Sequence, residues 1–297
     1  MADPGQEASH VLGDGRVVEY WEGGDPEGRG MILHPGTPAT RLLGRWGHEA
    51  AASAGVRLVS VSRPGYGGST VNTAEAPSLL AVGRDTAALA SHLGLDEYAV
   101  FGISGGGPFA VATAVADTGA VRALGVVGGV GPWRLLDESS ADLEEREVLA
   151  LLDAGDVAGA WAGFRLLSEQ EYAGLRPLGD AARVDAILAG NQSPLIHDDD
   201  YRAIWADAMR VVLDGLDGQV FDNLAWGGIW DVDPRDIVAP SLLWYGELDE
   251  GQPPAVGGWY ADRIAGSHLT ILPGEGHLDV CDSHWPDVLA GLLRIWG

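Results

Sequence analysis

One stretch of the sequence decides the fold: Tyr98-Ala99-Val100-Phe101-Gly102-Ile103-Ser104-Gly105-Gly106-Gly107-Pro108-Phe109-Ala110. An apolar run ends in Gly-x-Ser-x-Gly, and small residues at helical spacing follow at once. This order predicts a buried strand that turns sharply into a helix, with Ser104 at the bend. Such a bend requires neighbours with almost no side chain, such as Gly102 and Gly106. The Ser104 hydroxyl would then stand above the sheet, with the helix N-terminus and the Gly105 N–H beneath any oxyanion that forms.

The Gly-x-Ser-x-Gly pattern is weak on its own, because the chain contains 44 glycines. A glycine-rich helix start also fits a tight packing contact or a phosphate-binding loop. A Walker-type loop needs Gly-Lys-Ser/Thr, and the chain contains no lysine, so that alternative is excluded. The interpretation of Ser104 as a nucleophile therefore depends on its context: a strand before it, a helix after it, and suitable partners further along the chain.

The composition limits the possible partners. A chain of 297 residues, 46% of them hydrophobic, can bury a sizeable core as one large domain or two smaller ones. The formal net charge of −25 argues against nucleic acids and anionic membrane surfaces. No apolar run approaches the roughly 18 residues that span a membrane. We therefore expect a small-molecule substrate and neither a nucleic-acid nor a membrane partner, while the oligomeric state stays open.

Two features bear on the cellular compartment. The single cysteine, Cys281, excludes an internal disulfide and fits a reducing environment. The segment from Met1 to His10 lacks the apolar core of a signal peptide. Together they predict a cytoplasmic protein.

Short apolar runs alternate with helical patterns along most of the chain. The runs predicted as strands are 17–21, 31–33, 56–62, 98–103, 121–128, 241–245 and 268–272. Such alternation predicts an α/β protein with a mostly parallel sheet, joined by right-handed crossovers and covered by helices on both faces. The first hairpin is expected to pair antiparallel at one edge.

The pattern changes between Trp133 and Trp230, where helical spacing prevails and strand signals are few. We interpret residues 133–230 as a helical cap inserted into a core domain made of residues 1–132 and 231–297. Several tryptophans lie in the cap, and they either form its own core or line an apolar pocket above Ser104. The residues predicted to bind substrate are Trp133, Trp161 and Trp205.

Three chemically suited residues follow three predicted strands: Ser104, Asp249 and His277. The carboxyl ends of parallel strands meet at one edge of a sheet, where ligands bind. A serine hydroxyl needs a base to remove its proton, and histidine can do so near neutral pH. Asp249 would fix the tautomer of His277 and stabilise the imidazolium. The alternatives for these roles are Glu247 and Glu250 for the acid, and His268 and His284 for the base.

Five segments together resemble the α/β-hydrolase fold superfamily over nearly the whole chain. They are His34-Pro35-Gly36-Thr37-Pro38, Arg63-Pro64-Gly65-Tyr66-Gly67-Gly68-Ser69, Gly102-Ile103-Ser104-Gly105-Gly106-Gly107-Pro108, Gly246-Glu247-Leu248-Asp249 and Pro273-Gly274-Glu275-Gly276-His277-Leu278. Capped bacterial hydrolases of the proline-iminopeptidase, haloperoxidase and esterase type are the most similar in appearance. The resemblance implies an eight-stranded sheet, with Ser104 as nucleophile, Asp249 as acid and His277 as base.

The resemblance also implies an oxyanion hole made by the backbone N–H groups of Gly105 and Thr37. Two positions depart from the family pattern. Pro35 separates the usual His-Gly pair, so Gly36 is an alternative donor to Thr37. Ser62 replaces the acid that commonly precedes Arg-Pro-Gly. Neither change affects the triad, but the first leaves the register of the oxyanion hole open.

Some other polar residues have structural explanations. His34 is expected to organise its loop by hydrogen bonding, with an indirect catalytic role as the alternative, and Arg63 is expected to be a structural ion-pair partner. The run from His197 to Asp200 has the composition of a metal site. Four adjacent side chains cannot converge on one ion, so we interpret this run as an acidic helix start. We predict no metal and no organic cofactor.

These features predict a serine hydrolase that cleaves a carboxylic ester, thioester or lactone of a small, largely apolar substrate. A carbon–carbon bond hydrolase or a perhydrolase with the same triad is an alternative. A non-hydrolytic biosynthetic cyclase or a ligand-binding protein is another, because a fold does not fix a function.

Overall fold

The structure, a computed structural model, describes residues 5–133, 143–189 and 193–297. Eight strands form one sheet in the order β1-β2-β4-β3-β5-β6-β7-β8. Their bounds are β1 Gln6–Val11, β2 Val17–Gly24, β3 Arg29–His34, β4 Val56–Val61, β5 Tyr98–Ile103, β6 Val121–Val127, β7 Ser241–Gly246 and β8 His268–Leu272. The pairs β1–β2 and β2–β4 are antiparallel, and all other pairs are parallel. The predicted mostly parallel, eight-stranded sheet is therefore confirmed.

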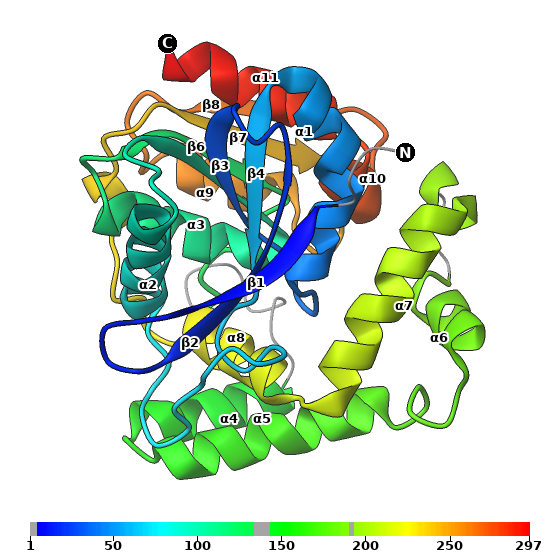
Figure 1. Cartoon of the computed structure of the whole chain (residues 1–297). Coiled ribbons are helices and arrows are strands. Elements are labelled where there is room, and N and C mark those ends of the chain that lie inside the picture. The colour runs from blue at the N-terminus through cyan, green and yellow to red at the C-terminus, as the bar shows by residue number, and fades with distance from the viewer. Residues whose placement is uncertain (1–4, 134–142, 190–192) are drawn as a thin grey trace.

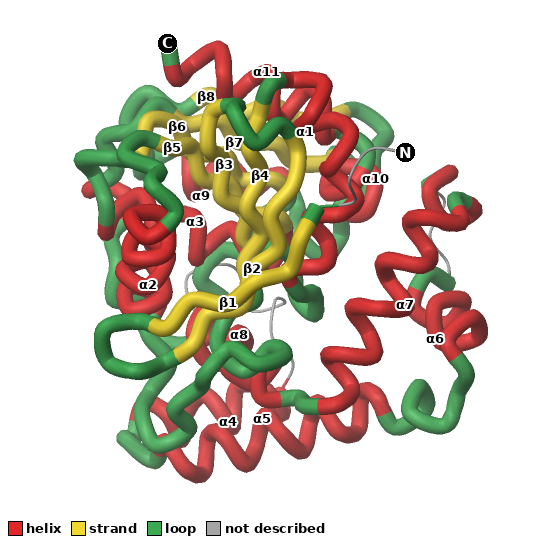
Figure 2. The backbone as a smooth tube through the Cα atoms, in the orientation of Figure 1, coloured by secondary structure: helices red, strands yellow, loops and turns green. Residues whose placement is uncertain are grey.

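Helices cover both faces of this sheet (Figures 1 and 2). On one face lie α2 (Leu79–His92), α3 (Gly107–Ala116) and α9 (Pro254–Ala261); on the other lie α1 (His48–Ala54) and α11 (Trp285–Trp296). Four short 3₁₀ helices and α10 are further helical segments among the described residues. They are η1 Arg41–Gly47, η2 Ser104–Gly106, η3 Pro194–His197, η4 Pro234–Asp236 and α10 His277–Asp282. Of these, η3 and η4 lie between β6 and β7.

The strand β5 shows why the sheet is stable between its two helical layers. All of its residues are buried, and successive side chains point to opposite faces. Tyr98 and Val100 pack in the apolar cluster with α2, α3 and α9. Ala99 and Phe101 pack in the cluster with α1 and α11. Burial of each large apolar side chain stabilises the fold by about 1.5–3 kcal/mol, so both layers hold the central strand in register.

Among the residues described between β6 and β7 are five α-helices: α4 Leu143–Asp153, α5 Val157–Tyr172, α6 Asp180–Ile187, α7 Asp199–Asp214 and α8 Asp217–Gly227. Residues 134–142 and 190–192 of the predicted cap lie outside the described residues. α4, α5 and α8 share one apolar cluster with the start of α2 and with Phe109 of α3. Helices α4, α5 and α8 therefore pack directly on helices of the sheet domain, while the division into a core domain and a cap stays a prediction.

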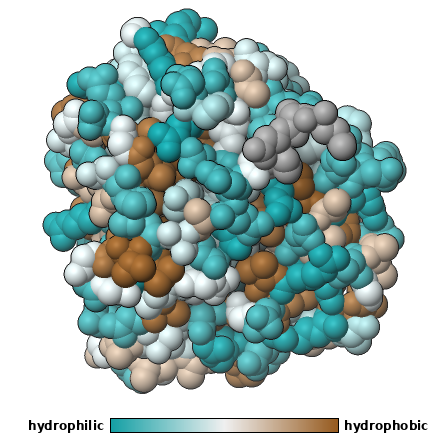
Figure 3. All heavy atoms as spheres, in the orientation of Figure 1, coloured by the Kyte–Doolittle hydropathy of each residue, from teal (hydrophilic) through white to brown (hydrophobic). Residues whose placement is uncertain are grey.

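The surface carries mostly polar side chains. Figure 3 shows hydrophilic residues over much of the visible face, with separate apolar patches between them. Within the described ranges, every helix is too short or too polar to span a lipid bilayer.

Candidate active site

Ser104 stands at the bend between β5 and α3. Its φ of +50° is the one positive φ at a non-glycine position in the part of the chain that the structure describes. A Cβ on Gly102 would lie 2.3 Å from the Gly106 carbonyl oxygen, and a Cβ on Gly106 would lie 2.0 Å from the His34 carbonyl oxygen. These contacts leave room only for glycine, so the chain can turn tightly and the loop after β3 can approach Ser104.

The structure brings Ser104, His277 and Asp249 together at the carboxyl ends of β5, β8 and β7. His277 Nε2 lies 2.9 Å from Ser104 Oγ, and His277 Nδ1 lies 2.6 Å from Asp249 Oδ2. The Asp249 side chain is fully buried, whereas one third of the His277 side chain is exposed. Asp249 Oδ1 also accepts the Gln252 N–H at 2.7 Å, which fixes the plane of the carboxylate. The three groups can therefore pass a proton from the hydroxyl to the imidazole.

The structure gives the alternative acids and bases other surroundings. Glu247 accepts a hydrogen bond from the Gly274 N–H, and His284 pairs with Glu275 at 2.6 Å. Glu250 and His268 are exposed.

The charge of His277 depends on its neighbours. Burial lowers the pKa of His277, but its neighbours outweigh burial and hold this pKa above the usual 6.5; because the Cys281 thiol is uncharged, we attribute the increase to the hydrogen bond and the charge of Asp249. Cys281 Sγ lies 3.8 Å from His277 Nε2, one turn further along α10. Burial raises the pKa of the Cys281 thiol, which is therefore neutral near pH 7. We infer that the Asp249 carboxylate is the charge that stabilises the imidazolium.

The loop after β3 lies beside Ser104. A Cβ on Gly36 would lie 3.4 Å from Ser104 Cβ and 4.0 Å from Ser104 Oγ. A Cβ on Gly105 would lie 2.4 Å from Thr37 Oγ1, so the two predicted donor residues are in contact. Neither the Gly36 nor the Thr37 N–H donates a hydrogen bond to another residue that the structure describes. Both amides are thus available to an oxyanion, and the register of the hole stays open.

The loop after β3 is tied to the rest of the fold by buried groups. His34 Nε2 lies 3.0 Å from Thr113 Oγ1 of α3. Burial, with the nearby Arg63 charge, holds the pKa of His34 well below the usual 6.5, so its imidazole is neutral. The hydrogen bond to α3 is the structural role that the sequence indicates for His34.

A buried ion pair holds the same loop, and the sequence predicted only one of its two members. Arg63 Nε lies 2.9 Å from Asp222 Oδ1, and Arg63 Nη2 lies 2.6 Å from Asp222 Oδ2. Both side chains are 0% exposed. Arg63 also donates to the carbonyl oxygens of Pro35, at 2.5 Å, and Gly36, at 2.9 Å. The sequence indicated an ion pair for Arg63 but gave no signal for its partner, which is 159 residues away.

Two of the three tryptophans predicted to bind substrate are engaged in packing. Trp161 is 5% exposed in the apolar cluster of α4, α5 and α8, and its indole N–H donates to the Glu75 carbonyl at 3.4 Å. Trp205 lies edge-on to Tyr201, with ring centroids 6.3 Å apart. Their role in substrate binding stays a prediction.

The third tryptophan, Trp133, packs against Trp226, which in turn lies next to the turn at Ser104. Its ring centroid lies 6.0 Å from that of Trp226 on α8. A Cβ on Gly105 would lie 2.5 Å from the Trp226 ring, so Trp226 lies directly against the nucleophile turn. The sequence placed Trp226 among the cap aromatics without a role of its own.

The acidic run at 197–200 begins α7. Asp198 Oδ1 accepts the Tyr201 N–H at 2.9 Å and caps that helix. This contact gives the aspartate a local structural role.

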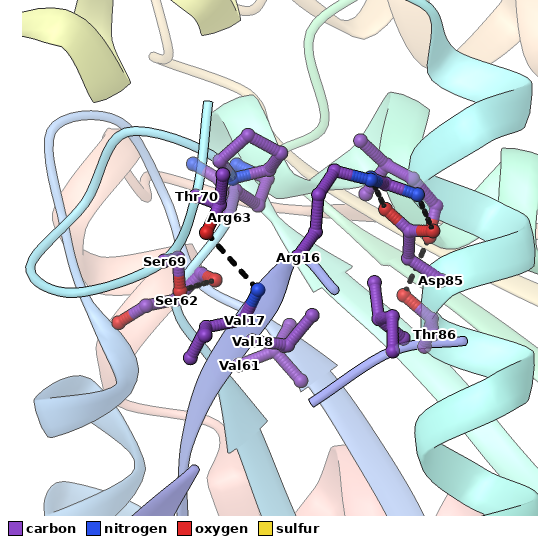
Figure 4. Close-up of a pocket in the computed structure, with 13 residues that line it drawn as sticks. Arg16, Val17, Val18, Val61, Ser62, Arg63, Ser69, Thr70, Asp85 and Thr86 are labelled. Carbon is purple, nitrogen blue, oxygen red and sulfur yellow. Dashed lines mark hydrogen bonds and ion pairs between the residues drawn. The ribbon is translucent and has the colours of Figure 1, made fainter. Parts of the chain in front are cut away.

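A small cavity is lined in part by Arg63 and Ser62 (Figure 4). Arg16 closes one side of it with a two-bonded ion pair to Asp85 of α2, in which Nη2 lies 2.7 Å from Oδ1. The cavity holds about 20 Å³, which is room for about one water molecule. It is too small for an organic substrate and belongs to the packing of the loop after β4.

Comparisons with known proteins bear on the fold. No protein-family model matches the chain, and neither does any curated protein sequence. Many solved structures are similar. An α/β hydrolase fold protein from Nakamurella multipartita is 23% identical with a TM-score of 0.64, and covers 98% of this chain and 100% of its own.

Two further similar structures are those of named enzymes. An esterase from Exiguobacterium antarcticum is 18% identical with a TM-score of 0.66, over 98% of this chain and 99% of its own. The enol-lactonase from Burkholderia xenovorans LB400 is 16% identical with a TM-score of 0.67, over 97% of this chain and 100% of its own. Together with the strand order and the turn at Ser104, these similarities show that the chain has the α/β-hydrolase fold.

Proposed function

We propose that this protein is a serine hydrolase that cleaves a carboxylic ester, thioester or lactone of a small, largely apolar substrate. The observation that carries the proposal is the hydrogen-bonded series from Ser104 through His277 to Asp249, with distances of 2.9 Å and 2.6 Å. Two of the similar structures are named as an esterase and an enol-lactonase, which supports this substrate class.

The first half of the proposed reaction forms an acyl-enzyme. Ser104 Oγ attacks the substrate carbonyl carbon while His277 Nε2 takes the hydroxyl proton. The carbonyl π electrons move to its oxygen, and the N–H groups of Gly105 and Thr37 hold the resulting oxyanion. When the tetrahedral intermediate collapses, the bond to the leaving oxygen or sulfur breaks and His277 returns the proton to it.

The second half regenerates the enzyme. His277 removes a proton from a solvent water, whose oxygen attacks the acyl carbon bound to Ser104. The second tetrahedral intermediate collapses to a carboxylic acid, and the proton returns to Ser104 Oγ. Asp249 stays ionised throughout and stabilises the imidazolium twice in each cycle. In this proposal the core domain of residues 1–132 and 231–297 supplies the triad, and the cap of residues 133–230 shapes the pocket.

The compartment and partners follow from the same proposal. A hydrolase with one free, buried cysteine suits a reducing cytoplasm. The net charge of −25 argues against nucleic acid or an anionic membrane as a partner and leaves a small-molecule substrate.

The test uses a single change at the proposed nucleophile. Ser104→Ala is expected to lower the turnover of short p-nitrophenyl esters by at least about 10⁴-fold, since little catalysis survives loss of the nucleophile. Labelling by a fluorophosphonate probe should disappear as well. The matched control is Ser9→Ala, an exposed serine on the edge strand β1, which should leave both readouts unchanged. Ester turnover or labelling that survives Ser104→Ala would contradict the proposal.

A further inference from the structure

One face of α8 lies against the groups that surround Ser104. Asp222 and Trp226 are four residues apart, so they lie on the same face of this helix. Trp226 contacts the Gly105 position of the nucleophile turn, and Asp222 contacts Arg63 behind the loop after β3. This helix of the predicted cap therefore contacts both segments that would supply the oxyanion donors, the turn at Gly105 and the loop after β3.

The Asp222 carboxylate accepts four hydrogen bonds from the sheet domain. Two come from Arg63, at 2.9 Å and 2.6 Å. The third comes from Thr37 Oγ1 at 2.5 Å, and the fourth from the Tyr66 hydroxyl at 2.9 Å. A carboxylate that is 0% exposed is costly unless its oxygens are paired in this way. These paired groups are therefore held rigidly. They fix the backbone of the loop after β3 through Arg63, and the Thr37 side chain of that loop through Asp222.

The orientation of two peptide groups follows from these bonds. Arg63 holds the carbonyl oxygens of Pro35 and Gly36. In a planar trans peptide, the C=O and the N–H of the next residue point in opposite directions. The N–H groups of Gly36 and Thr37 are therefore turned away from Arg63. Gly36 also lies against Ser104, because a Cβ at Gly36 would be 3.4 Å from Ser104 Cβ.

We propose that Asp222 is a positioning residue for the oxyanion hole: through Arg63 and Thr37 it aims the candidate donor amides at the oxyanion. The inference rests on the proposed hydrolase function and deepens it, because it gives a cap helix a part in stabilising the transition state. Preorganised donors act mainly on the charge that develops in the transition state. Loss of Asp222 should therefore lower kcat and leave KM nearly unchanged.

The decisive variant replaces both members of the ion pair, Arg63→Met with Asp222→Leu. Removal of Asp222 alone would leave a buried, unpaired guanidinium and destabilise the fold. Apolar residues of similar volume at both positions leave no buried charge, so the remaining cost is that of the Pro35 and Gly36 carbonyls and the Tyr66 hydroxyl, which lose these hydrogen bonds. We expect the double variant to fold and to lose about 10²-fold in kcat, as when an oxyanion donor is removed. Its affinity for phenylboronic acid, which forms a tetrahedral adduct with the serine, should fall by a similar factor.

A second variant covers the case in which the double variant does not fold. Asp222→Asn keeps the size of the side chain and one acceptor oxygen. In assays below the unfolding temperature of this variant, we expect about a 10-fold loss in kcat with KM unchanged. The matched control is Tyr98→Phe, which removes a 3.0 Å bond to Asp117 at the opposite end of β5 and should leave kcat unchanged.

The outcomes separate this inference from the hydrolase proposal. Wild-type kcat and boronic-acid affinity in a folded Asp222 variant would overturn the inference, while the loss of labelling in Ser104→Ala would still support the hydrolase. Labelling that persists in Ser104→Ala would overturn the hydrolase proposal itself.

Discussion

His277 links activity to pH at the scale of a single residue. The imidazole must be neutral to act as a base, but its pKa lies well above 6.5, because its neighbours outweigh the effect of burial. We expect kcat/KM to rise with pH through a midpoint above 6.5, measured on a p-nitrophenyl ester from about pH 5 to about pH 9. In Asp249→Asn the residual activity should show a midpoint at lower pH. A wild-type midpoint at or below 6.5 would contradict this assignment.

The same group affects stability in the opposite direction. A histidine whose pKa is raised by folding stabilises the folded state fully below its unfolded pKa, and this contribution is lost as the pH rises through the folded pKa. The free energy of unfolding should therefore decrease across the range in which activity increases. In His277→Gln that pH dependence should be weaker, as measured by urea unfolding at several pH values.

Asp282 is a second buried group with a shifted pKa. Burial raises the pKa of Asp282 from 3.8 to about 6. The Tyr201 hydroxyl donates a hydrogen bond to the carboxylate, which lowers this pKa but does not offset the effect of burial. The contribution of Asp282 therefore lowers the free energy of unfolding as the pH rises from about 4 to about 6. The difference between the two pKa values corresponds to about 3 kcal/mol of lost stability at neutral pH.

We expect Asp282→Asn to raise the free energy of unfolding by about 1–3 kcal/mol at pH 8 and by less at pH 5, because the amide stays neutral and still accepts from Tyr201. The measurement is chemical denaturation at both pH values. Tyr201→Phe is the control, since it removes the hydrogen bond but keeps the carboxylate. An Asp282→Asn variant that is less stable than wild type at pH 8 would show that the charge is favourable there.

At the scale of elements, η2, α8 and the loop after β3 meet at Gly105. A Cβ there would lie 2.4 Å from Thr37 Oγ1 and 2.5 Å from the Trp226 ring. Gly105→Ala must therefore displace the loop or the helix, and we expect kcat to fall by about 10²-fold, the cost of one misplaced oxyanion donor. Gly119→Ala is the matched control, because a Cβ there meets nothing within 4 Å. Equal kcat values in the two variants would show that the contact is unimportant for catalysis.

The order of strands and helices in the sheet domain could be predicted, because each element has its own local pattern of apolar and turn residues. β5 is a continuous apolar run, and Gly102 and Gly106 mark the turn at its end. The carboxyl ends of parallel strands then had to meet, so the neighbourhood of Ser104, Asp249 and His277 followed from topology alone. The sequence did not predict the short helix α10, which begins at His277, because six residues after Pro-Gly-Glu-Gly show too little periodicity.

The contacts of α8 with the proposed site could not be predicted from the sequence, because they depend on which face of the helix meets the sheet domain. Most residues of α8 are buried, including the polar Gln219 and Asp222. In the sequence Asp222 is one of 43 acids, and its partner Arg63 is 159 residues away. A helix buried on all sides has no polar stripe that would show which face meets the sheet domain.

At the scale of the whole molecule, acids outnumber arginines by 43 to 18, which leaves a net charge of −25. Several arginines join distant elements through more than one acid: Arg45 pairs with both Glu7 and Asp207, at 2.6 Å and 3.0 Å. Each exposed pair contributes only about 0–1 kcal/mol and is weakened by salt. The unpaired acids repel one another in the compact state, and salt screens that repulsion as well.

These two effects of salt oppose each other, and the excess of acids decides the sign. We expect the unfolding temperature to rise when NaCl is increased from about 20 mM to about 500 mM, a range over which the screening length falls from well above to well below 10 Å. The measurement is thermal unfolding at constant pH. A control variant, Glu27→Gln with Glu75→Gln, removes two exposed acids and should show a smaller rise. An unfolding temperature that falls with salt would show that the ion pairs, such as those of Arg45, outweigh the general repulsion.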